Sequence, residues 1–176
     1  MAEIRIHRIT PEQKADINIK NESFPLFGRM LPSYTNGEWD YTTELLDTPA
    51  EDLFPDENYD FDKMEKTHLF IGAYQDETCI GLAILEKQWH KYLYLSDLKI
   101  NKAFRRQGVA SRLLQEAERW AKELSYQGLW TVGQDNNLAA CLFYVHNGFF
   151  IGGLDTKVYT GTKLAGVADI HFYKDF

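Results

Sequence analysis

The sequence is poor in cysteine and proline and has no long apolar run, and each shortage excludes a class of protein. Among its 176 residues are two cysteines and five prolines. Cys79 and Cys141 lie singly in apolar stretches without the spacing of metal ligands, so we expect reduced core residues and no metal site. No apolar run approaches the length of a membrane span, and the first five residues lack the features of a secretory signal. These absences predict a cytoplasmic protein that does not insert into a membrane.

Acidic residues outnumber basic ones, and the imbalance is concentrated in one segment. The formal net charge is −7. Between Glu38 and Glu65 there are eleven acids and one base, which gives −10, so the remaining residues have 15 acids and 18 bases, or +3. Because no basic face is evident, nucleic acid is a poor partner. The acidic segment is either a solvated loop, which is the usual role of a charge run, or part of a site for a cation.

Alternating and helical patterns predict an α+β protein. We expect strands at residues 3–8, 68–74, 79–87, 92–100, 129–133, 149–159 and 167–173. We expect helices at 109–124 and 138–146, and a first helix that begins after Thr10 and ends before Pro25. Residues 24–37 and 47–62 are expected to be loops, with a short helix at 39–46 between them. This order predicts a single domain over residues 1–176, with a mixed central β-sheet flanked by helices. The 44% hydrophobic and 26% charged composition is typical of such a domain.

A predicted strand, a basic turn and a predicted helix occupy residues 93–114. The turn that joins the strand to the helix reads Arg105-Arg106-Gln107-Gly108-Val109-Ala110. The first amides of a helix lack intrahelical partners and lie at the positive end of its dipole, so they bind phosphate well. Gly108 lets the backbone approach closely, and arginines add charge-assisted bonds. An ordinary turn with solvated arginines fits this spacing equally well, because short glycine motifs occur by chance.

The spacing Arg105-x-x-Gly108-x-Ala110 after a strand resembles the pyrophosphate loop of the GCN5-related N-acetyltransferases (GNAT), which bind acetyl-CoA. The predicted order of elements agrees with that fold along the entire chain. The resemblance implies that the pyrophosphate lies on the loop amides, helped by Arg105 or Arg106, and that the pantetheine arm pairs with the strand edge at Leu98 and Ile100. The amides concerned belong to Gln107, Gly108, Val109, Ala110 and Ser111. One departure is Ala110, where glycine is commonest in the family.

A second stretch, from Asn136 to Tyr144 and followed by Gly148-Phe149, resembles the second motif of the same family. By this resemblance, Asn137 contacts the cofactor, and Tyr144 lies beside the thioester sulfur as its general acid. The alternatives are an Asn137 that only caps the helix and a Tyr144 that only packs on the sheet. Two motifs in the correct order and on the correct elements favour the functional roles.

Further residues look like those of streptothricin acetyltransferases, which acetylate an amine on the β-lysine part of a cationic antibiotic. They are Asn36-x-x-Trp39, Thr43-Glu44-Leu45-Leu46, Gln134-Asp135-Asn136-Asn137 and Phe149-x-Ile151-Gly152-x-x-Asp155-Thr156. Because Trp39 and Glu44 lie outside the cofactor motifs, the resemblance assigns them to the acceptor side.

The resemblance implies an enzyme that transfers acetyl from acetyl-CoA to a primary amine of a cationic small molecule, as a streptothricin resistance enzyme does. Such a reaction needs a neutral amine and a protonated leaving thiolate. Asp97, an acid in an otherwise apolar strand, is our candidate for orienting or deprotonating the amine, and a purely structural carboxylate is the equal alternative. Acetylation of a polyamine or a protein amine stays open, as do a catalytically silent acyl-CoA-binding module and a homodimer paired through the final strands.

Overall fold

The computed structural model describes residues 3–176, which divide into two compact units. The first unit contains the residues up to Ser23, Leu53–Leu129 and Phe176, and the second contains Phe24–Asp52 and Trp130–Asp175. Within residues 3–176 no helix has the length and apolar character needed to cross a membrane. The same residues include no group of three or more His, Cys, Asp or Glu side chains that could hold a metal ion. Both cysteines are buried free thiols, as predicted.

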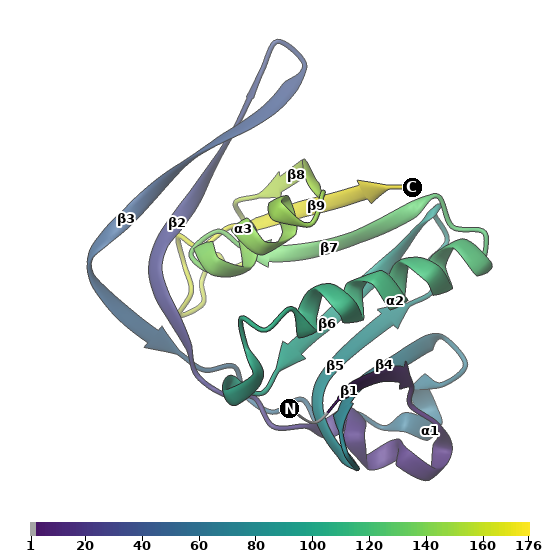
Figure 1. Ribbon diagram of the computed structural model, residues 1–176. Helices are drawn as coiled ribbons and strands as arrows, with labels where there is room; N and C mark the ends of the chain where they lie inside the picture. The colour runs from purple at the N-terminus through teal and green to yellow at the C-terminus, as the bar shows by residue number, and fades with distance from the viewer. Residues whose placement is uncertain (1–2) are drawn as a thin grey trace. The chain divides into compact units, whose positions relative to one another are not determined.

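Four strands form the sheet of the first unit, in the order β1-β4-β5-β6, with every neighbouring pair antiparallel. They are β1 (Ile4–Arg8), β4 (His68–Gln75), β5 (Thr78–Glu86) and β6 (Tyr92–Ile100). The helix α2 (Val109–Glu123) lies along one face of these strands (Figure 1). Its buried side chains recur at helical spacing, which explains why the segment folds as an amphipathic helix; they are Val109, Leu113, Leu114, Ala117 and Ala121.

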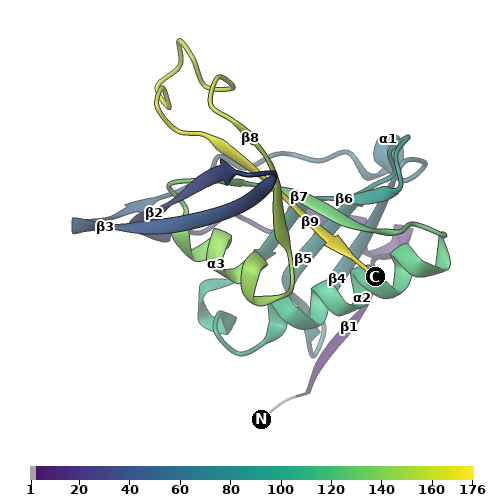
Figure 2. The same cartoon turned by 90° about the horizontal axis from the view of Figure 1, so that it is seen from above.

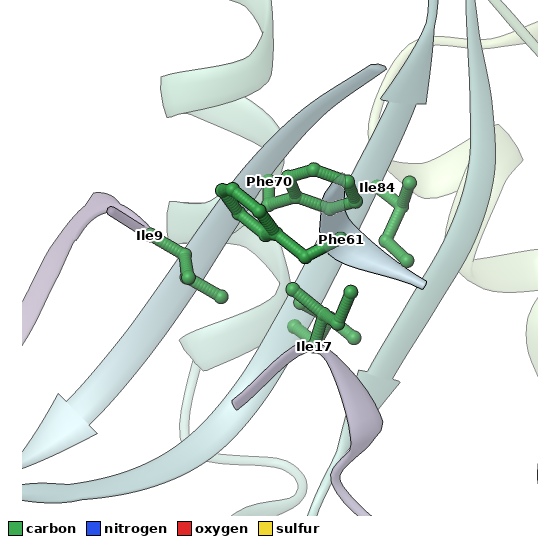
Figure 3. Packing of buried hydrophobic residues seen from close by; sticks show 6 residues of the cluster. Ile9, Ile17, Phe61, Phe70 and Ile84 are labelled. Carbon is green, nitrogen blue, oxygen red and sulfur yellow. The ribbon is translucent and has the colours of Figure 1, made fainter. Parts of the chain in front are cut away.

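The other face of the same strands is covered by the 3₁₀ helix η1 (Pro11–Asn18) and the short helix α1 (Phe61–Met64). Their side chains close over a hydrophobic cluster made of Ile9, Ile17, Phe61, Phe70, Leu82 and Ile84 (Figure 3). The ring centroids of Phe61 and Phe70 are 5.0 Å apart. Tyr59 is partly buried against this cluster and donates a hydrogen bond to Asp97 of β6. The packing of α1 therefore fixes the preceding segment beside β6.

The second unit contains most of β7, together with β9, β8 and the helix α3, and the strands are neighbours in the order β7-β9-β8. Their bounds are β7 (Gly128–Gln134), β8 (Phe150–Asp155), β9 (Asp169–Asp175) and α3 (Leu138–His146). β8 and β9 are antiparallel. Asn137 caps α3, because its side-chain Oδ1 accepts a hydrogen bond from the amide of Ala140 at 3.2 Å. The helix predicted at residues 138–146 is confirmed.

Residues 24–52 form a long β-hairpin, so the predicted loop, short helix and start of a second loop are wrong. β2 (Phe24–Thr35) and β3 (Glu38–Asp52) pair antiparallel as a separate two-stranded sheet (Figure 2). Asn36 and Gly37 make the turn, with φ values of 54° and 86°. Positive φ at both positions gives a turn whose twist matches that of paired strands, and Asn-Gly is the preferred sequence for it.

Prolines in this hairpin account for the loop prediction. Pro25, Pro32 and Pro49 all lie within its strands. Proline cannot donate to a strand ladder, so its presence argues against a central strand. In a two-stranded sheet both strands are edge strands, and edge strands tolerate proline on their unpaired side.

Candidate functional site

The loop between β6 and α2 leaves the first turn of α2 open. The short 3₁₀ helix η2 (Lys102–Phe104) follows β6, and Gly108 then adopts a left-handed conformation with φ 79° and ψ 2°. Within residues 3–176 no side chain caps α2, and a Cβ built on Gly108 would meet no atom within 4 Å beyond its own chain neighbours. The loop predicted to bind phosphate therefore has free space at the positive end of a 15-residue helix, which suits an anion.

The two arginines of this loop differ in their partners. The Arg105 guanidinium donates to three backbone oxygens, those of Ile100 at 2.9 Å, Ser23 at 2.7 Å and Glu22 at 3.3 Å. It therefore fastens the loop to the residues just before the hairpin. Arg106 is exposed and has a positive φ of 61°. Of the two arginines expected at the phosphate, Arg106 is the one whose guanidinium is not engaged by backbone oxygens of residues 3–176.

β6 contains a bulge next to Asp97. In the pairing with β5, Ile84 lies opposite Asp97 and Leu85 lies opposite Leu95, so Ser96 is the extra residue. The Ser96 hydroxyl donates to the backbone oxygen of Ile84 at 3.2 Å. Bulges re-aim side chains and are frequent beside active sites. The bulge therefore determines how the residues after it are presented.

After the bulge, the side chains of β6 alternate between the two faces of the sheet. Leu98 and Ile100 are half-buried. Ile100 lies on the face covered by α2, because a Cβ built on Gly81 would lie 2.7 Å from Ile100 Cδ1 and 3.3 Å from Leu113 of α2. Asp97 and Lys99 lie on the other face, with η1 and α1. The pairing of Leu98 and Ile100 with pantetheine stays a prediction.

Two carboxylates, a lysine and a tyrosine meet on that second face, and we call Glu57, Tyr59, Asp97 and Lys99 the Asp97 cluster. Lys99 Nζ lies 2.9 Å from Asp97 Oδ2 and 2.8 Å from Glu57 Oε2. Tyr59 Oη donates to the same Asp97 Oδ2 at 3.1 Å. The side chains of Asp97 and Lys99 are 14% and 11% exposed, and that of Glu57 is 30% exposed. Two carboxylates and one ammonium give this sheltered cluster one net negative charge.

Burial and neighbouring charges shift the pKa of the acids in the cluster. Burial raises the pKa of Asp97, and this outweighs the lowering by the Lys99 ammonium and the Tyr59 hydroxyl. Burial also raises the pKa of Tyr59, and the charges of Asp97 and Glu57 act in the same direction, so Tyr59 stays protonated as a donor. Burial acts upward on Glu57 too, but hydrogen bonds from Lys99 and Asn21 hold its pKa below the usual value. A carboxylate with a raised pKa is suited to proton transfer near neutral pH.

In the second unit, the two residues assigned by the second motif lie on α3 and its cap. Asn137 uses its Oδ1 for the cap described above, whereas its Nδ2 has no partner among residues 3–176. Tyr144 is 8% exposed and packs in an aromatic layer, with ring centroids 5.5 Å from Phe149 and 5.4 Å from Phe172. The cap and the packing that the sequence offered as alternatives are therefore both present, and the cofactor contacts of Asn137 and Tyr144 stay predictions.

The two residues assigned to the acceptor lie on opposite faces of the hairpin. Trp39 pairs with Tyr34, and their ring centroids are 4.9 Å apart. Glu44 is exposed and lies opposite Arg29 in the register of the two strands. The register is unbroken between these two pairs, so residues five apart in β3 point in opposite directions. One face of the hairpin, the acidic face, thus has Glu38, Asp40 and Glu44 together with Arg29, and the other, the aromatic face, has Tyr34, Trp39 and Tyr41.

Sequence reasoning missed a partly buried ion pair in the second unit and two members of the Asp97 cluster. Arg29 lies 2.9 Å from Asp135 Oδ2, and Asp135 Oδ1 accepts from the amide of Ala168 at 3.0 Å. In the sequence, Asp135 stands only as part of the motif at residues 134–137, and no motif contains Lys99 or Glu57. The period-two spacing of Asp97 and Lys99 was the one local signal that could have placed the lysine beside the acid.

Comparisons with known proteins show the family to which the chain belongs. Residues 32–149 match the model of a family described as the acetyltransferase (GNAT) family. Streptothricin acetyltransferase A of Bacillus subtilis (strain 168) is 34% identical over 172 residues, which is 97% of this chain and 99% of that protein. A streptothricin acetyltransferase of Escherichia coli is 25% identical over 159 residues, which is 90% of this chain and 80% of that protein.

Solved structures confirm the predicted α+β fold with its mixed sheet and flanking helices. A candidate streptothricin acetyltransferase from Bacillus anthracis str. Ames, in complex with acetyl-CoA, is 28% identical with a TM-score of 0.89, covering 99% of this chain and 100% of that one. A nourseothricin acetyltransferase has a TM-score of 0.81 over 98% of each chain, and at 23% identity it supports the fold alone.

Proposed function

Because the chain belongs to the acetyltransferase (GNAT) family, we propose that it acetylates an amine of a streptothricin-type antibiotic and so inactivates it. The family membership confirms the predicted acetyltransferase with acetyl-CoA as the acyl donor. The observation that supports the acceptor is the 34% identity to the Bacillus subtilis streptothricin acetyltransferase. That similarity extends over 97% of the chain, so it includes the hairpin and the acidic segment as well as the cofactor motifs.

The donor would bind through the loop before α2. The pyrophosphate would accept hydrogen bonds from the loop amides, namely those of Gln107, Gly108, Val109, Ala110 and Ser111. The free space at Gly108 and the absence of a side-chain cap on α2 support this assignment. The exposed Arg106 would supply charge, whereas Arg105 would hold the loop in shape. Leu98 and Ile100 would pair with the pantetheine arm, and the Nδ2 of Asn137 would add a further contact.

The transfer itself needs one group that takes a proton from the amine and one that returns a proton to sulfur. As the amine nitrogen bonds to the thioester carbon, it loses a proton, and as the carbon–sulfur bond breaks, the sulfur gains one. Asp97 is the proposed acceptor of the amine proton, because it is a sheltered carboxylate with a raised pKa. Tyr144 is the proposed donor to sulfur, by the resemblance of its motif. Holding amine and thioester together would supply much of the rate.

The acceptor is proposed to be a polycation drawn in by the acidic segment. Glu44 lies on the acidic face of the hairpin with Glu38 and Asp40, where several carboxylates attract ammonium groups together. Trp39 lies on the aromatic face with Tyr41 and would hold an alkylammonium group by cation–π contact. Because the faces differ, Glu44 and Trp39 would act on different parts of the acceptor or on different ligands.

Purified protein with acetyl-CoA, assayed by release of free CoA thiol, tests the proposal. Streptothricin, a polyamine and a peptide with a free amino terminus should be compared at equal concentration. We expect the highest kcat/KM with streptothricin, and the acetylated drug should no longer inhibit a susceptible strain. A preference for the polyamine or the peptide would replace the proposed acceptor. Acetyl-CoA binding without thiol release by any amine would indicate a silent acyl-CoA-binding module.

A further inference from the structure

The two oxygens of the Asp97 carboxylate have different surroundings. Oδ2 accepts from Tyr59 at 3.1 Å and lies 2.9 Å from the Lys99 ammonium. Oδ1 accepts no hydrogen bond from residues 3–176. A carboxylate oxygen that already has two strong donors is a poor proton acceptor, because protonation would break those bonds. The geometry therefore leaves Oδ1 as the reactive oxygen of Asp97.

We infer that Lys99 and Tyr59 are positioning residues that bind Asp97 Oδ2 together and so direct Oδ1 to the attacking nitrogen of the acceptor. This inference rests on the proposed acetyl transfer and assigns the catalytic contact to one atom. A proton passes from the nitrogen to Oδ1 as the nitrogen–carbon bond forms. The thioester carbon–sulfur bond breaks and the sulfur takes up a proton, so transfer to the neutral amine releases no net proton, and the one proton released overall is the one that the ammonium loses before attack.

Lys99 is itself held from several directions, which makes it a firm support for Asp97. Its ammonium lies 2.8 Å from Glu57 Oε2 and 5.7 Å from the centre of the Tyr59 ring. Asn21 Nδ2 donates to the other Glu57 oxygen, Oε1, at 2.9 Å. A cation with two carboxylates and an aromatic face has few alternative positions, so the bond to Oδ2 is well defined.

The charged and titratable groups that face Asp97 come from two elements. Lys99 comes from its own strand, and Glu57 and Tyr59 come from the segment before α1. The opposite residue on β5 is Ile84, which does not titrate. The Lys99 ammonium and the Tyr59 hydroxyl favour the carboxylate form, whereas the Glu57 charge opposes it. Removing Lys99 or the Tyr59 hydroxyl should therefore raise the pKa of Asp97, and removing the charge of Glu57 should lower it.

The test is the acidic limb of kcat/KM against pH in three variants. Lys99→Met should move this limb to higher pH by at least about one pH unit, the lower end of the effect of a close opposite charge. Tyr59→Phe should move it the same way by less, because one neutral hydrogen bond is lost. Glu57→Gln should move it to lower pH, because a like charge is removed. The acceptor's own ammonium titrates identically in every variant, so the differences report the enzyme.

Matched controls separate this effect from a general loss of stability. Lys14 lies 2.9 Å from Asp62 in an exposed ion pair of the same unit, so Lys14→Met removes a lysine–aspartate pair away from Asp97. Tyr74 Oη donates to Asp16 at 2.8 Å, so Tyr74→Phe removes a tyrosine–aspartate hydrogen bond elsewhere. Neither control should move the limb. Lys99→Arg keeps the positive charge, so its acidic limb should lie within a few tenths of a pH unit of that of the unsubstituted protein.

A second readout does not depend on turnover. Carbon NMR of the Asp97 carboxyl should show its titration midpoint moving upward in Lys99→Met and Tyr59→Phe and downward in Glu57→Gln. Unmoved midpoints would overturn the inference, as would limbs that move alike in all three variants. If another amine is acetylated in place of streptothricin, the proposed acceptor fails, and the same profiles measured with that amine decide the inference. If no amine is acetylated, both fail.

Discussion

Substitution of Gly108 by valine should weaken acetyl-CoA binding, because the new side chain would occupy space that the pyrophosphate needs. Gly108 has φ 79° and a Cβ there would meet no other atom within 4 Å. Gly161 provides a matched control, because it has φ 78° and equally open surroundings in a loop of the second unit. An L-residue in this left-handed conformation costs about 1–2 kcal/mol, so valine at either position should destabilise the protein equally.

The loss of affinity should be specific to Gly108. A branched side chain above the first turn of α2 would keep the pyrophosphate from one or two of its amide donors. Hydrogen bonds to charged groups contribute about 1.5–3 kcal/mol each, so the loss is about 1.5–6 kcal/mol. Since 1.4 kcal/mol corresponds to a factor of ten, the Kd for acetyl-CoA should rise about tenfold to 10⁴-fold.

Isothermal titration calorimetry with acetyl-CoA measures this directly, and thermal unfolding without ligand checks the matched strain. Gly108→Val and Gly161→Val should unfold at similar temperatures, while only Gly108→Val binds weakly. If a folded Gly108→Val bound acetyl-CoA as tightly as Gly161→Val, the pyrophosphate could not lie on this loop. The assignment of Arg106 and of the amides of residues 107–111 would then fail with it.

Three further changes test the remaining assignments. Tyr144→Phe should lower the single-turnover rate by about 10²–10⁴-fold with little change in the Kd for acetyl-CoA, because a general acid acts only as the carbon–sulfur bond breaks. An unchanged rate would mean that Tyr144 only packs against the sheet. Glu44→Gln should raise KM for a cationic acceptor and flatten its rise with salt, whereas Glu118→Gln on α2 should do neither. Asp135→Ala should lower the free energy of unfolding in denaturant by about 3 kcal/mol. That is the low end for breaking a buried pair, since Arg29 is 34% exposed.

Elements defined by a continuous local pattern were predictable from the sequence. The strand at residues 92–100 and the helix at 138–146 have the predicted bounds, and the helix beginning at Val109 ends one residue earlier than expected. In each case the apolar pattern and the surrounding polar residues indicate the same element, and for the helix at 138–146 the capping residue Asn137 does so as well. The open loop at Gly108 was also predictable from local sequence, because a glycine directly before a helix indicates a turn that leaves the first helical amides accessible.

The hairpin and the Asp97 cluster depend on information that no local window contains. An edge strand that contains proline has the local sequence of a loop, and only its pairing partner identifies it as a strand. In this hairpin both partners contain proline, so neither strand could identify the other. Glu57 and Lys99 are 42 residues apart, and only the packing of α1 on the sheet brings the acid to the lysine. The opposite directions of Trp39 and Glu44 likewise follow only once the segment is known to be a strand. Side chains alternate every two residues in a strand but repeat about every 3.6 residues in the helix that the sequence predicts here.

The acidic segment consequently contains two physically different sets of carboxylates rather than one charged loop. Glu38, Asp40 and Glu44 are exposed on the hairpin, where salt screens them over about 8 Å at physiological ionic strength. Glu57 is fixed to Lys99 in a sheltered cluster, where screening is weak and its effect is on the protonation of Asp97. Salt should therefore act on acceptor KM through the hairpin, while pH acts on turnover through the cluster. Since the two responses arise from different residues, Glu44→Gln should leave the pH profile in place, and Glu57→Gln should leave the salt dependence in place.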